Sequence, residues 1–448
     1  MKIKGFYNVL SVLVLAAVVL SCKANKAAKP KITNPNIIII MADDMGYGDL
    51  SCYGSTLINT PNLDKMAAEG IRFTDFHANG SVCSPTRAAL LTGKYQQRVG
   101  IDGVVTAKKH RDKGLATAEK TFAEAIKESG YVTGMFGKWH VGYKTEFNPI
   151  NQGFDEYIGY VSGNVDYHSH IDQEGYEDWW VDDKIQNEKG YSTDLITKHS
   201  VDFIKRHKDE PFLLYIPHEA PHGPFQGRKS AAERYVGWKS GSAPKNKMSE
   251  EELNAIYKEM VEVMDEGVGK VMATLKELKI DKNTIVFFCS DNGASRKVGS
   301  NGGLRGYKST LWEGGHRVSA MAWYPGTIEP NQVNNETILT IDLFPTIMSF
   351  AGSETPENLD GINLRNNLVK GETLPNRNVF WGYAGRKAIR HDDWKLILRN
   401  KNAEPQLYNL KQDISETTNV ASEHPELVKT LLQKLEAWSK DVYTDSNK

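Results

Sequence analysis

The chain has 448 residues, more than one small hydrophobic core requires, so a large domain accompanied by a smaller one is expected. Its 55 lysines and arginines nearly balance its 56 aspartates and glutamates, leaving a formal net charge of −1. This balance excludes a broad basic surface for a nucleic-acid backbone, so no nucleic acid is expected as a partner and any recognition of anions must be local.

The first 22 residues have the pattern of an export signal. Two lysines precede an apolar run at residues 9–20, which is too short to span a bilayer comfortably. Ser21 and Cys22 follow, and a small residue directly before a cysteine is typical of a bacterial lipoprotein cleavage site. Lipid attachment to Cys22 is the favoured interpretation, with ordinary signal cleavage nearby as the alternative. We therefore expect an exported protein of a Gram-negative bacterium, in the periplasm or on the outer membrane, with residues 23–34 as a tether and membrane contact only through that lipid.

Short apolar runs rich in β-branched or aromatic residues predict four buried strands, at residues 37–41, 131–136, 212–216 and 285–288. Helical patterns lie between them, at residues 62–69, 119–129, 193–207 and 250–278. This alternation predicts an α/β fold, in which a large, mostly parallel sheet is sandwiched by helices.

Polar side chains follow each of these predicted strands. In chain order they are Asp43 and Asp44, Lys138 and His140, His218 and His222, and Asp291 and Asn292. Ligands of open α/β sheets bind beyond the carboxyl ends of the strands, so we expect all four groups to converge at one edge. The alternative, helix capping and turn formation, is common for any single one of them.

The pattern changes after about residue 370. Short runs at residues 379–382, 387–390, 394–398 and 406–410 predict a small antiparallel sheet, closed by an amphipathic helix at residues 426–439. We therefore expect a large domain over residues 35–370 and a C-terminal α+β subdomain over residues 371–448.

The four cysteines do not predict a disulfide framework. Cys22 belongs to the cleavage site, Cys83 opens a predicted helix, and Cys289 follows an apolar run where a buried thiol is expected. Only Cys52 with Cys289 remains as a candidate bridge, and we do not expect it to form.

Residues 83–87 read Cys-Ser-Pro-Thr-Arg, followed by Ala-Ala-Leu-Leu-Thr-Gly. Pro85 suits the first helical position and Ser84 the cap. Cys83 then stands at a helix N-terminus, where backbone N–H groups and the helix dipole favour an anion, with Arg87 one turn further on. A packed core thiol is the alternative for Cys83.

This motif resembles the signature Cys-x-Pro-x-Arg of the type I sulfatases, of the alkaline phosphatase-like superfamily. The resemblance covers about residues 35–425 and extends through Ala-Asp-Asp-Met-Gly-Tyr-Gly-Asp (42–49), Gly-Lys-Trp-His (137–140), Ser-Asp-Asn-Gly (290–293) and Trp-Glu-Gly-Gly (312–315). Such a spaced set is far more specific than any single motif. It implies the alkaline phosphatase-like fold and a sulfuric ester hydrolase. His316, after the last motif, departs from the family pattern.

The resemblance also implies that an enzyme oxidises Cys83 to formylglycine (3-oxoalanine). A formylglycine-generating or sulfatase-maturating enzyme is therefore an expected partner. The hydrated aldehyde carries two hydroxyls, so one can attack sulfur and the other can then expel the sulfate by re-forming the carbonyl. A serine could attack but would lack this exit.

A hard divalent cation prefers oxygen ligands, and Asp43, Asp44, Asp291 and Asn292 offer three carboxylates and an amide. By resemblance these four residues and the oxygen of modified Cys83 bind one calcium ion per chain. Magnesium is a weaker possibility, and zinc is disfavoured because the cluster lacks sulfur ligands.

The resemblance places three cations, Arg87, Lys138 and Lys308, where charge develops on the sulfate oxygens. Lys138 and Lys308 would also bind substrate. His140 would orient the formylglycine. Two histidines compete to protonate the leaving alcohol: His222 fits the family pattern His-x-Pro, which leaves His218 as a substrate-binding residue or a histidine satisfied by packing.

Two segments, at residues 153–189 and 225–247, are expected to carry specificity. Their aromatic and basic side chains suit a sulfated sugar, although each aromatic could equally pack its own loop: Tyr167, His168, His170, Trp179, Trp180, Arg228 and Trp238. The family resemblance and the export signal together predict a sulfated carbohydrate, either an algal polysaccharide such as ulvan or carrageenan or a glycosaminoglycan. The alternatives are a phosphonate or phosphate ester hydrolase of the same superfamily and a non-catalytic lipoprotein that binds sulfated glycans.

Overall fold

The computed structural model describes residues 34–239 and 248–445, and the residues from Asn34 onward form one compact unit. The predicted export signal, Cys22 and nearly all of the tether lie outside the described residues. No helix in the described ranges is both long enough and apolar enough to cross a membrane. Cys52, Cys83 and Cys289 are free, so the candidate bridge between Cys52 and Cys289 is absent.

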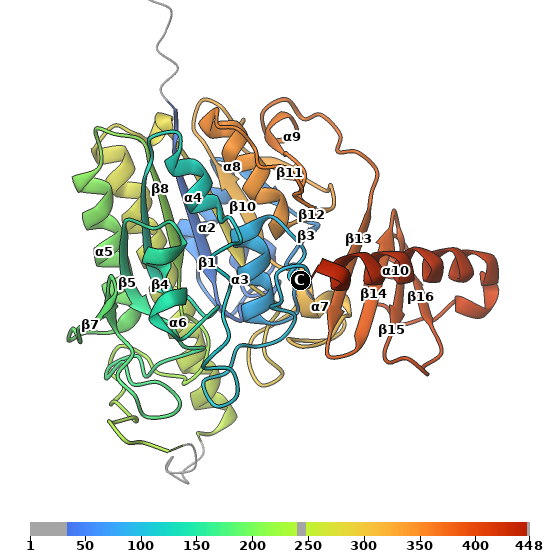
Figure 1. Ribbon diagram of the computed structural model, residues 1–448, viewed down its shortest axis with the longest axis horizontal. Coiled ribbons are helices and arrows are strands. Elements are labelled where there is room, and N and C mark those ends of the chain that lie inside the picture. The colour runs from blue at the N-terminus through green and yellow to red at the C-terminus, as the bar shows by residue number, and fades with distance from the viewer. Residues whose placement is uncertain (1–33, 240–247, 446–448) are drawn as a thin grey trace, which may run out of the picture. The chain divides into compact units, whose positions relative to one another are not determined.

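The four predicted strands form the centre of a ten-stranded sheet (Figure 1). They are β9 (Thr284–Ser290), β1 (Asn36–Ala42), β8 (Phe212–Pro217) and β4 (Val132–Lys138), adjacent in that order and mutually parallel. Because all four run the same way, their carboxyl ends meet at one edge of the sheet.

The remaining strands of this sheet were not predicted, because most are too short to show a periodic pattern. The sheet continues beyond β4 with β5 (Glu156–Tyr160), β6 (Trp180–Val181) and β7 (Lys184–Ile185), and beyond β9 with β10 (Ala320–Trp323), β2 (Ile71–Phe73) and β11 (Gln332–Asn334). β10 runs antiparallel to β9. A separate pair joins β3 (Phe76–His77) to β12 (Ile338–Leu339) in parallel.

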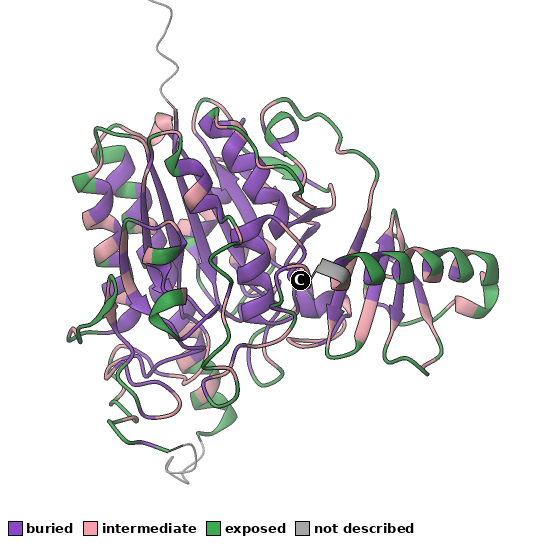
Figure 2. Cartoon of the chain, viewed as in Figure 1, coloured by how far each residue is buried: buried purple, intermediate pink, exposed green. Residues whose placement is uncertain are grey.

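Helices cover both faces of the sheet, and β1 shows why. Its alternate residues Ile37, Ile39 and Met41 enter one core, whereas Ile38, Ile40 and Ala42 enter the other. The first core is closed by α3 (Cys83–Thr92), α4 (Phe122–Lys127) and α8 (Leu343–Ala351), and the second by α2 (Pro61–Ala68), α5 (Ser192–Arg206) and α6 (Glu250–Glu277). Figure 2 shows the strands buried and the outer helix faces exposed.

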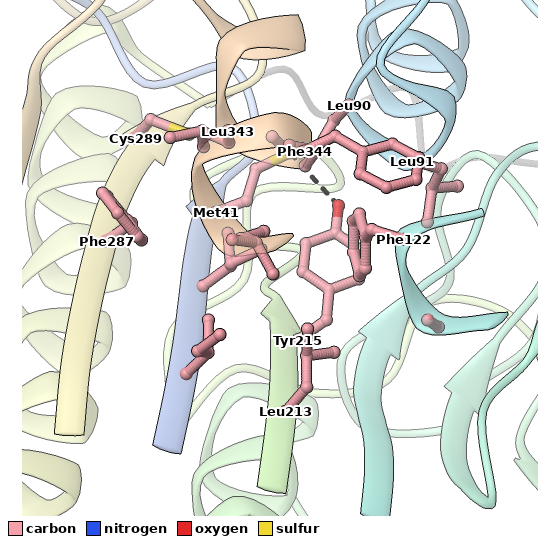
Figure 3. Packing of buried hydrophobic residues seen from close by; sticks show 14 of the residues in the cluster. Met41, Leu90, Leu91, Phe122, Leu213, Tyr215, Phe287, Cys289, Leu343 and Phe344 are labelled. Carbon is pink, nitrogen blue, oxygen red and sulfur yellow. Dashed lines mark hydrogen bonds between the residues drawn. The ribbon is translucent and has the colours of Figure 1, made fainter. Parts of the chain in front are cut away.

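Figure 3 shows how densely the first core is packed. The phenol of Tyr215 on β8 donates to the sulfur of Met41 at 3.3 Å, and its ring packs edge-on against Phe122 of α4. Phe122 also meets Phe344 of α8 edge-on, with ring centroids 6.3 Å apart. Such close packing fixes the strands whose ends carry the predicted site.

One predicted helix is shorter than expected. The segment at residues 119–129 is helical only from Phe122 to Lys127. Thr121 caps it, accepting the N–H of Glu124 while the Glu124 carboxylate accepts the N–H of Thr121. This capping box fixes the start three residues inside the predicted boundary.

The C-terminal prediction is confirmed. β13 (Asn378–Tyr383), β14 (Arg386–His391), β15 (Trp394–Leu398) and β16 (Gln406–Asn409) form an antiparallel sheet, followed by α10 (Pro425–Asp445). Its core also takes in Ala89 and Tyr95 from the α3 region. Two short helices complete the fold: α7 (Glu313–His316) and α9 (Arg365–Lys370). The predicted fold class, a large and mostly parallel sheet with a small antiparallel one, is therefore correct.

Candidate active site

The acidic residues that follow β1 and β9 meet at the start of α3. The Sγ atom of Cys83 lies 3.4 Å from Oδ1 of Asp43 and 4.0 Å from Oδ1 of Asp44. The N–H of Asp44 donates to Asp291 at 3.2 Å, and the amide of Asn292 donates to Asp44 at 2.7 Å. All five side chains are buried. The predicted convergence of strand ends therefore takes place, with Cys83 in its midst.

Cys83 is the first residue of α3, but the predicted cap is wrong. Val82 occupies the N-cap position and offers no capping side chain. The hydroxyl of Ser84 instead accepts the N–H of Val105 at 3.0 Å, and Thr86 accepts the N–H of Gly80 at 3.0 Å. Ser84 is thus used to hold a neighbouring segment. Cys83 still lies at the positive end of the helix dipole.

Each predicted cation faces a predicted carboxylate. Lys138 approaches Asp43 at 2.5 Å and Arg87 approaches Asp291 at 2.8 Å. Lys308 lies 2.7 Å from Asp44, and its Nζ is also 3.3 Å from the sulfur of Cys83.

We call these predicted residues that meet around Cys83 the active-site cluster: Asp43, Asp44, Cys83, Arg87, Lys138, Asp291, Asn292 and Lys308.

A close approach of backbones brings Lys308 to this position. A Cβ atom at Gly293 would lie 1.9 Å from the carbonyl oxygen of Gly314, and one at Gly315 would lie 2.0 Å from that of Thr310. Only glycine fits such contacts. The glycines of the Ser-Asp-Asn-Gly and Trp-Glu-Gly-Gly motifs therefore let the loop that carries Lys308 pack against the end of β9.

Two residues of the site adopt unusual backbone conformations. Asp44 has φ of 62° and His140 has φ of 61°, in the left-handed region that non-glycine residues seldom enter. Such conformations persist only where the surroundings hold them, and they gather at functional sites.

Electrostatics in the cluster separate its carboxylates. Burial and the nearby Asp43 raise the pKa of Asp291 to about 6. Burial would also raise the pKa of Asp44, but Lys308, His222 and Asn292 together outweigh it and hold that pKa well below its usual range. Burial and Asp43 raise the pKa of the Cys83 thiol, so the unmodified thiol is neutral at pH 7 and a poor nucleophile.

The structure distinguishes the three predicted histidines. The Nε2 atom of His222 is 3.7 Å from Asp44, whereas the ring of His218 is buried and its Nδ1 has no hydrogen-bond partner among the described residues. His140 is held through Nε2 by the carbonyl of Val105 at 3.1 Å. Burial, reinforced by Lys308, lowers the pKa of His222 to about 3, and burial lowers that of His218 to about 4.

The donor atoms of the cluster suit a hard cation. One ligand atom from each of Asp43, Asp44, Cys83 and His222 lies within 4.8 Å of the others. The side-chain oxygen of Asn292 is buried and has no hydrogen-bond partner among the described residues. An orphaned amide oxygen beside several carboxylates is the kind of donor set that Ca²⁺ prefers.

Sequence reasoning missed a second buried ionic cluster, between β3, α7 and the small sheet. His316, whose place was unexplained, has its Nδ1 3.0 Å from Nδ1 of His77 and stacks on Trp381 with centroids 4.1 Å apart. Lys395 of β15 lies 2.8 Å from Glu313 and 2.9 Å from Glu416. No sequence signal marked Lys395, because a lysine in a short strand is usually exposed.

We call this second group the brace cluster: Asp75, His77, Glu313, His316, Arg317, Arg390, Lys395 and Glu416.

Several aromatics of the expected specificity segments pack their own loops. Tyr167, His170 and Trp179 are fully buried, and the last two stack with centroids 4.3 Å apart. The phenol of Tyr167 donates to the carbonyl of His222 at 2.8 Å. Arg228 is paired with Asp194 and Glu266. The packing alternative therefore holds for these aromatics, and Tyr167 supports His222 from behind.

Comparison with known proteins gives one consistent result. The family model described as Sulfatase matches residues 35–353, and one described as N-sulphoglucosamine sulphohydrolase, C-terminal, matches residues 306–441. N-acetylgalactosamine-6-sulfatase of Mus musculus is 35% identical over 376 residues, which are 78% of this chain and 68% of that protein.

Solved structures agree. The structure of Ps i-CgsB with k-i-k-neocarrahexaose has a TM-score of 0.81 at 30% identity and covers 91% of this chain and 93% of that one. A structure concerned with the metabolism of glycosaminoglycans by Bacteroides thetaiotaomicron has a TM-score of 0.74 at 25% identity, covering 91% and 100%.

Proposed function

This chain belongs to the sulfatase family and hydrolyses sulfate esters, and we propose that its substrate is a sulfated carbohydrate attacked by a formylglycine made from Cys83. One observation carries the proposal: the sulfur of Cys83, at the start of α3, lies within hydrogen-bonding distance of both Asp43 and Lys308. An anion bound there would meet a reactive residue and fixed cations together.

The unmodified thiol gives a reason for the modification. A neutral, buried thiol is a poor nucleophile, so attack on sulfur requires another group at position 83. A hydrated formylglycine supplies two hydroxyls, one to attack sulfur and one to release the sulfate. A formylglycine-generating or sulfatase-maturating enzyme is then a necessary partner during biosynthesis.

Asp43, Asp44, Asp291 and Asn292 would hold one calcium ion, which would supply positive charge to polarise the sulfate. The orphaned oxygen of Asn292 supports this assignment. Lys138, Lys308 and Arg87 would stabilise the charge that develops on the sulfate oxygens, because each is already fixed by a carboxylate and needs little reorganisation.

His222 is the better candidate to protonate the leaving alcohol. The side chain of His222 is 18% exposed and lies 3.7 Å from Asp44, whereas Nδ1 of His218 is buried without a hydrogen-bond partner among the described residues. The negative charge of a bound sulfate ester would raise the pKa of His222 and favour the protonated ring. His140 would orient the residue at position 83, and His218 would line the substrate-binding side of the site.

Two lines support a carbohydrate. Ps i-CgsB was solved with k-i-k-neocarrahexaose, and Mus musculus N-acetylgalactosamine-6-sulfatase is named for a sulfated sugar. The predicted export signal and lipid anchor would place the enzyme outside the cytoplasm, where algal polysaccharides or glycosaminoglycans reach it. A phosphonate or phosphate ester hydrolase and a non-catalytic glycan binder remain the alternatives.

Mass spectrometry of the tryptic peptide 73–87, from protein made in its native host, tests the nucleophile. Formylglycine at position 83 is the expected result, and unmodified cysteine in active protein would refute it. Relative kcat/KM on aryl sulfate and aryl phosphate, followed by a panel of carrageenan, ulvan and glycosaminoglycan oligosaccharides, tests the substrate class. Hydrolysis of aryl sulfate without release of sulfate from any oligosaccharide would refute the carbohydrate.

A further inference from the structure

A cavity of about 430 Å³ lies beside the loop that carries Lys308. Residues of that loop form one wall, and strands β14 and β15 with the turn after them form the other. Its lining comprises Tyr307, Thr310, Leu311, Trp312, Arg386, Ile397, Arg399, Asn400 and Ala403. We call it the arginine-lined cavity. Its volume falls in the range of small-ligand sites.

Two arginines, Arg386 and Arg399, line this cavity, and Arg305 and Arg296 lie against its aromatic rings. The guanidinium of Arg305 lies 4.3 Å from the ring centroid of Trp312 and that of Arg399 lies 5.5 Å from it. Arg296 lies 5.6 Å from the centroid of Tyr307. Arg386 donates to the carbonyl of Ser309 at 2.6 Å.

Among the described residues, the charges of these guanidinium groups are not matched by ion pairs, although Arg305 donates to the hydroxyl of Tyr408 at 3.3 Å and to the carbonyl of Glu416 at 2.5 Å. Arg87, Arg228 and Arg377 each lie against a carboxylate. Within residues 34–239 and 248–445, no ion pair joins a carboxylate to Arg296, Arg305, Arg386 or Arg399. Two arginines in the lining and two beside its rings create a local positive potential, although the whole chain is nearly neutral.

The cavity and the active-site cluster take residues from the same loop. Tyr307 precedes Lys308 in the chain. The N–H of Ser309, the next residue, donates to the carbonyl of Ser81 at 2.7 Å, two residues before Cys83. On the other side, Arg296 follows Asn292 by four residues. The cavity therefore borders the same loop whose Lys308 faces Cys83.

We propose that the arginine-lined cavity is a subsite for a second anionic sugar unit of the substrate, one that bears a sulfate or a carboxylate next to the sugar that loses its sulfate. This inference rests on the proposed carbohydrate substrate and deepens it. Planar guanidinium groups match sulfate and carboxylate oxygens in a bidentate fashion, and their contacts with the rings of Trp312 and Tyr307 hold them in place. The enzyme thus prefers oligosaccharides with several charges over single sulfated sugars.

The test compares Arg399→Ala with the matched control Arg365→Ala. Both arginines lie over an aromatic ring, Arg365 at 5.3 Å from the Phe350 centroid, but Arg365 belongs to α9, away from the cavity. We measure kcat and KM on an aryl sulfate, on a sulfated monosaccharide and on oligosaccharides from carrageenan and chondroitin sulfate. Arg399→Ala should lower kcat/KM on the oligosaccharide about 10-fold relative to that on the aryl sulfate, mainly through KM, because a charge-assisted contact is lost. Arg365→Ala should leave this ratio unchanged.

Binding provides a readout that does not depend on turnover. The same oligosaccharides are titrated calorimetrically into Cys83→Ala and into Cys83→Ala/Arg399→Ala, where Kd should rise about 10-fold in the double variant. Equal Kd values and an unchanged kcat/KM ratio would overturn the subsite while leaving the carbohydrate substrate in place. Hydrolysis of aryl sulfate with neither binding nor hydrolysis of any oligosaccharide would overturn both.

Discussion

Residues 308–317 contribute to two buried ionic clusters, and the two clusters are built differently. In the brace cluster Lys395 is fully buried between Glu313 and Glu416, and Arg317 and Arg390 both pair with Asp75. In the active-site cluster each of three cations pairs with one carboxylate: Lys138 with Asp43, Lys308 with Asp44 and Arg87 with Asp291. There the oxygen of Asn292 is left without a partner among the described residues, and Asp44 has a φ of 62°. Glu416 of the brace cluster has a φ of 51° as well, and its buried Oε1 accepts no hydrogen bond from the described residues, but that oxygen lies 2.9 Å from the Lys395 ammonium.

Both clusters contain three or more side chains whose ligand atoms lie within 4.8 Å of one another. Proximity of ligands alone therefore does not identify a metal site. In the brace cluster the Lys395 ammonium lies 3.0 Å from Nε2 of His316 and takes the place that a cation would need. The unbonded oxygen of Glu416 is matched by this ammonium, whereas the oxygen of Asn292 has neither a hydrogen bond nor a cation among the described residues, which favours a ligand at the active-site cluster.

The largest expected effect is on activity, and it should distinguish the free buried thiols of Cys83 and Cys289. Cys83→Ala should lower kcat/KM on an aryl sulfate by roughly 10⁴-fold or more without loss of fold, because the nucleophile is removed. Cys289→Ala, the matched control on β9, should retain activity within a few-fold. Steady-state kinetics with circular dichroism measure both, and comparable activity in the two variants would remove Cys83 from the reaction.

The second prediction compares the loss of one paired lysine from each cluster. Lys395→Met should destabilise the fold by about 3 to 5 kcal/mol, because the buried carboxylates of Glu313 and Glu416 lose the lysine that pairs with both. Lys308→Met should instead lower kcat by about 10²- to 10³-fold, because it removes a cation from the reacting centre.

Urea unfolding and kinetics on the same two variants decide the matter. A stable Lys395→Met protein with strongly reduced kcat would mean that the brace cluster takes part in the reaction. A Lys308→Met protein that unfolds at much lower urea concentration would mean that Lys308 is structural.

Much of the fold was accessible from the sequence. The long central strands are uninterrupted apolar runs, so periodicity and composition find them, and glycine and capping residues mark their helices. The edge strands β6, β7 and β11 are two or three residues long, and their pairing depends on the neighbouring strand rather than on their own pattern.

The two ionic clusters also differ in how far the sequence predicted them. Asp43, Asp291 and Cys83 could be placed together because motifs follow strand ends, and the sheet brings those ends to one edge. His77 and Lys395 could not be placed together. They are far apart in the sequence, and each contacts His316 only because the small sheet packs against the large domain. Their partner His316 was noticed in the sequence, but no local pattern shows what a buried histidine contacts.

The third prediction concerns pH and Glu416. Burial raises the pKa of Glu416 from 4.5 to about 7, while Glu313 stays ionised beside Lys395. Between pH 4.5 and about 7, Glu416 is ionised in the unfolded chain but still protonated in the folded protein. Raising the pH through this range therefore favours the unfolded state. The free energy of unfolding should therefore fall as pH rises from about 4.5 to about 7, by roughly 3 kcal/mol from this residue. Glu416→Gln removes that part of the slope, and urea unfolding at pH 5 and pH 8 measures it. Parallel stability changes in the two proteins would show that Glu416 titrates normally.

The smallest effect discriminates most sharply between the clusters. Calcium at 100 times its Kd should raise the free energy of unfolding by about 2.7 kcal/mol, and chelation should reverse this. Asn292→Ala removes the orphaned oxygen, so its melting temperature should respond weakly to calcium. His316→Ala removes a ring from the brace cluster, where Lys395 already supplies the cation. The melting temperature of this variant should therefore respond to calcium as that of the unmodified sequence does. The opposite pattern, with the response lost in His316→Ala and kept in Asn292→Ala, would assign the metal to the brace cluster.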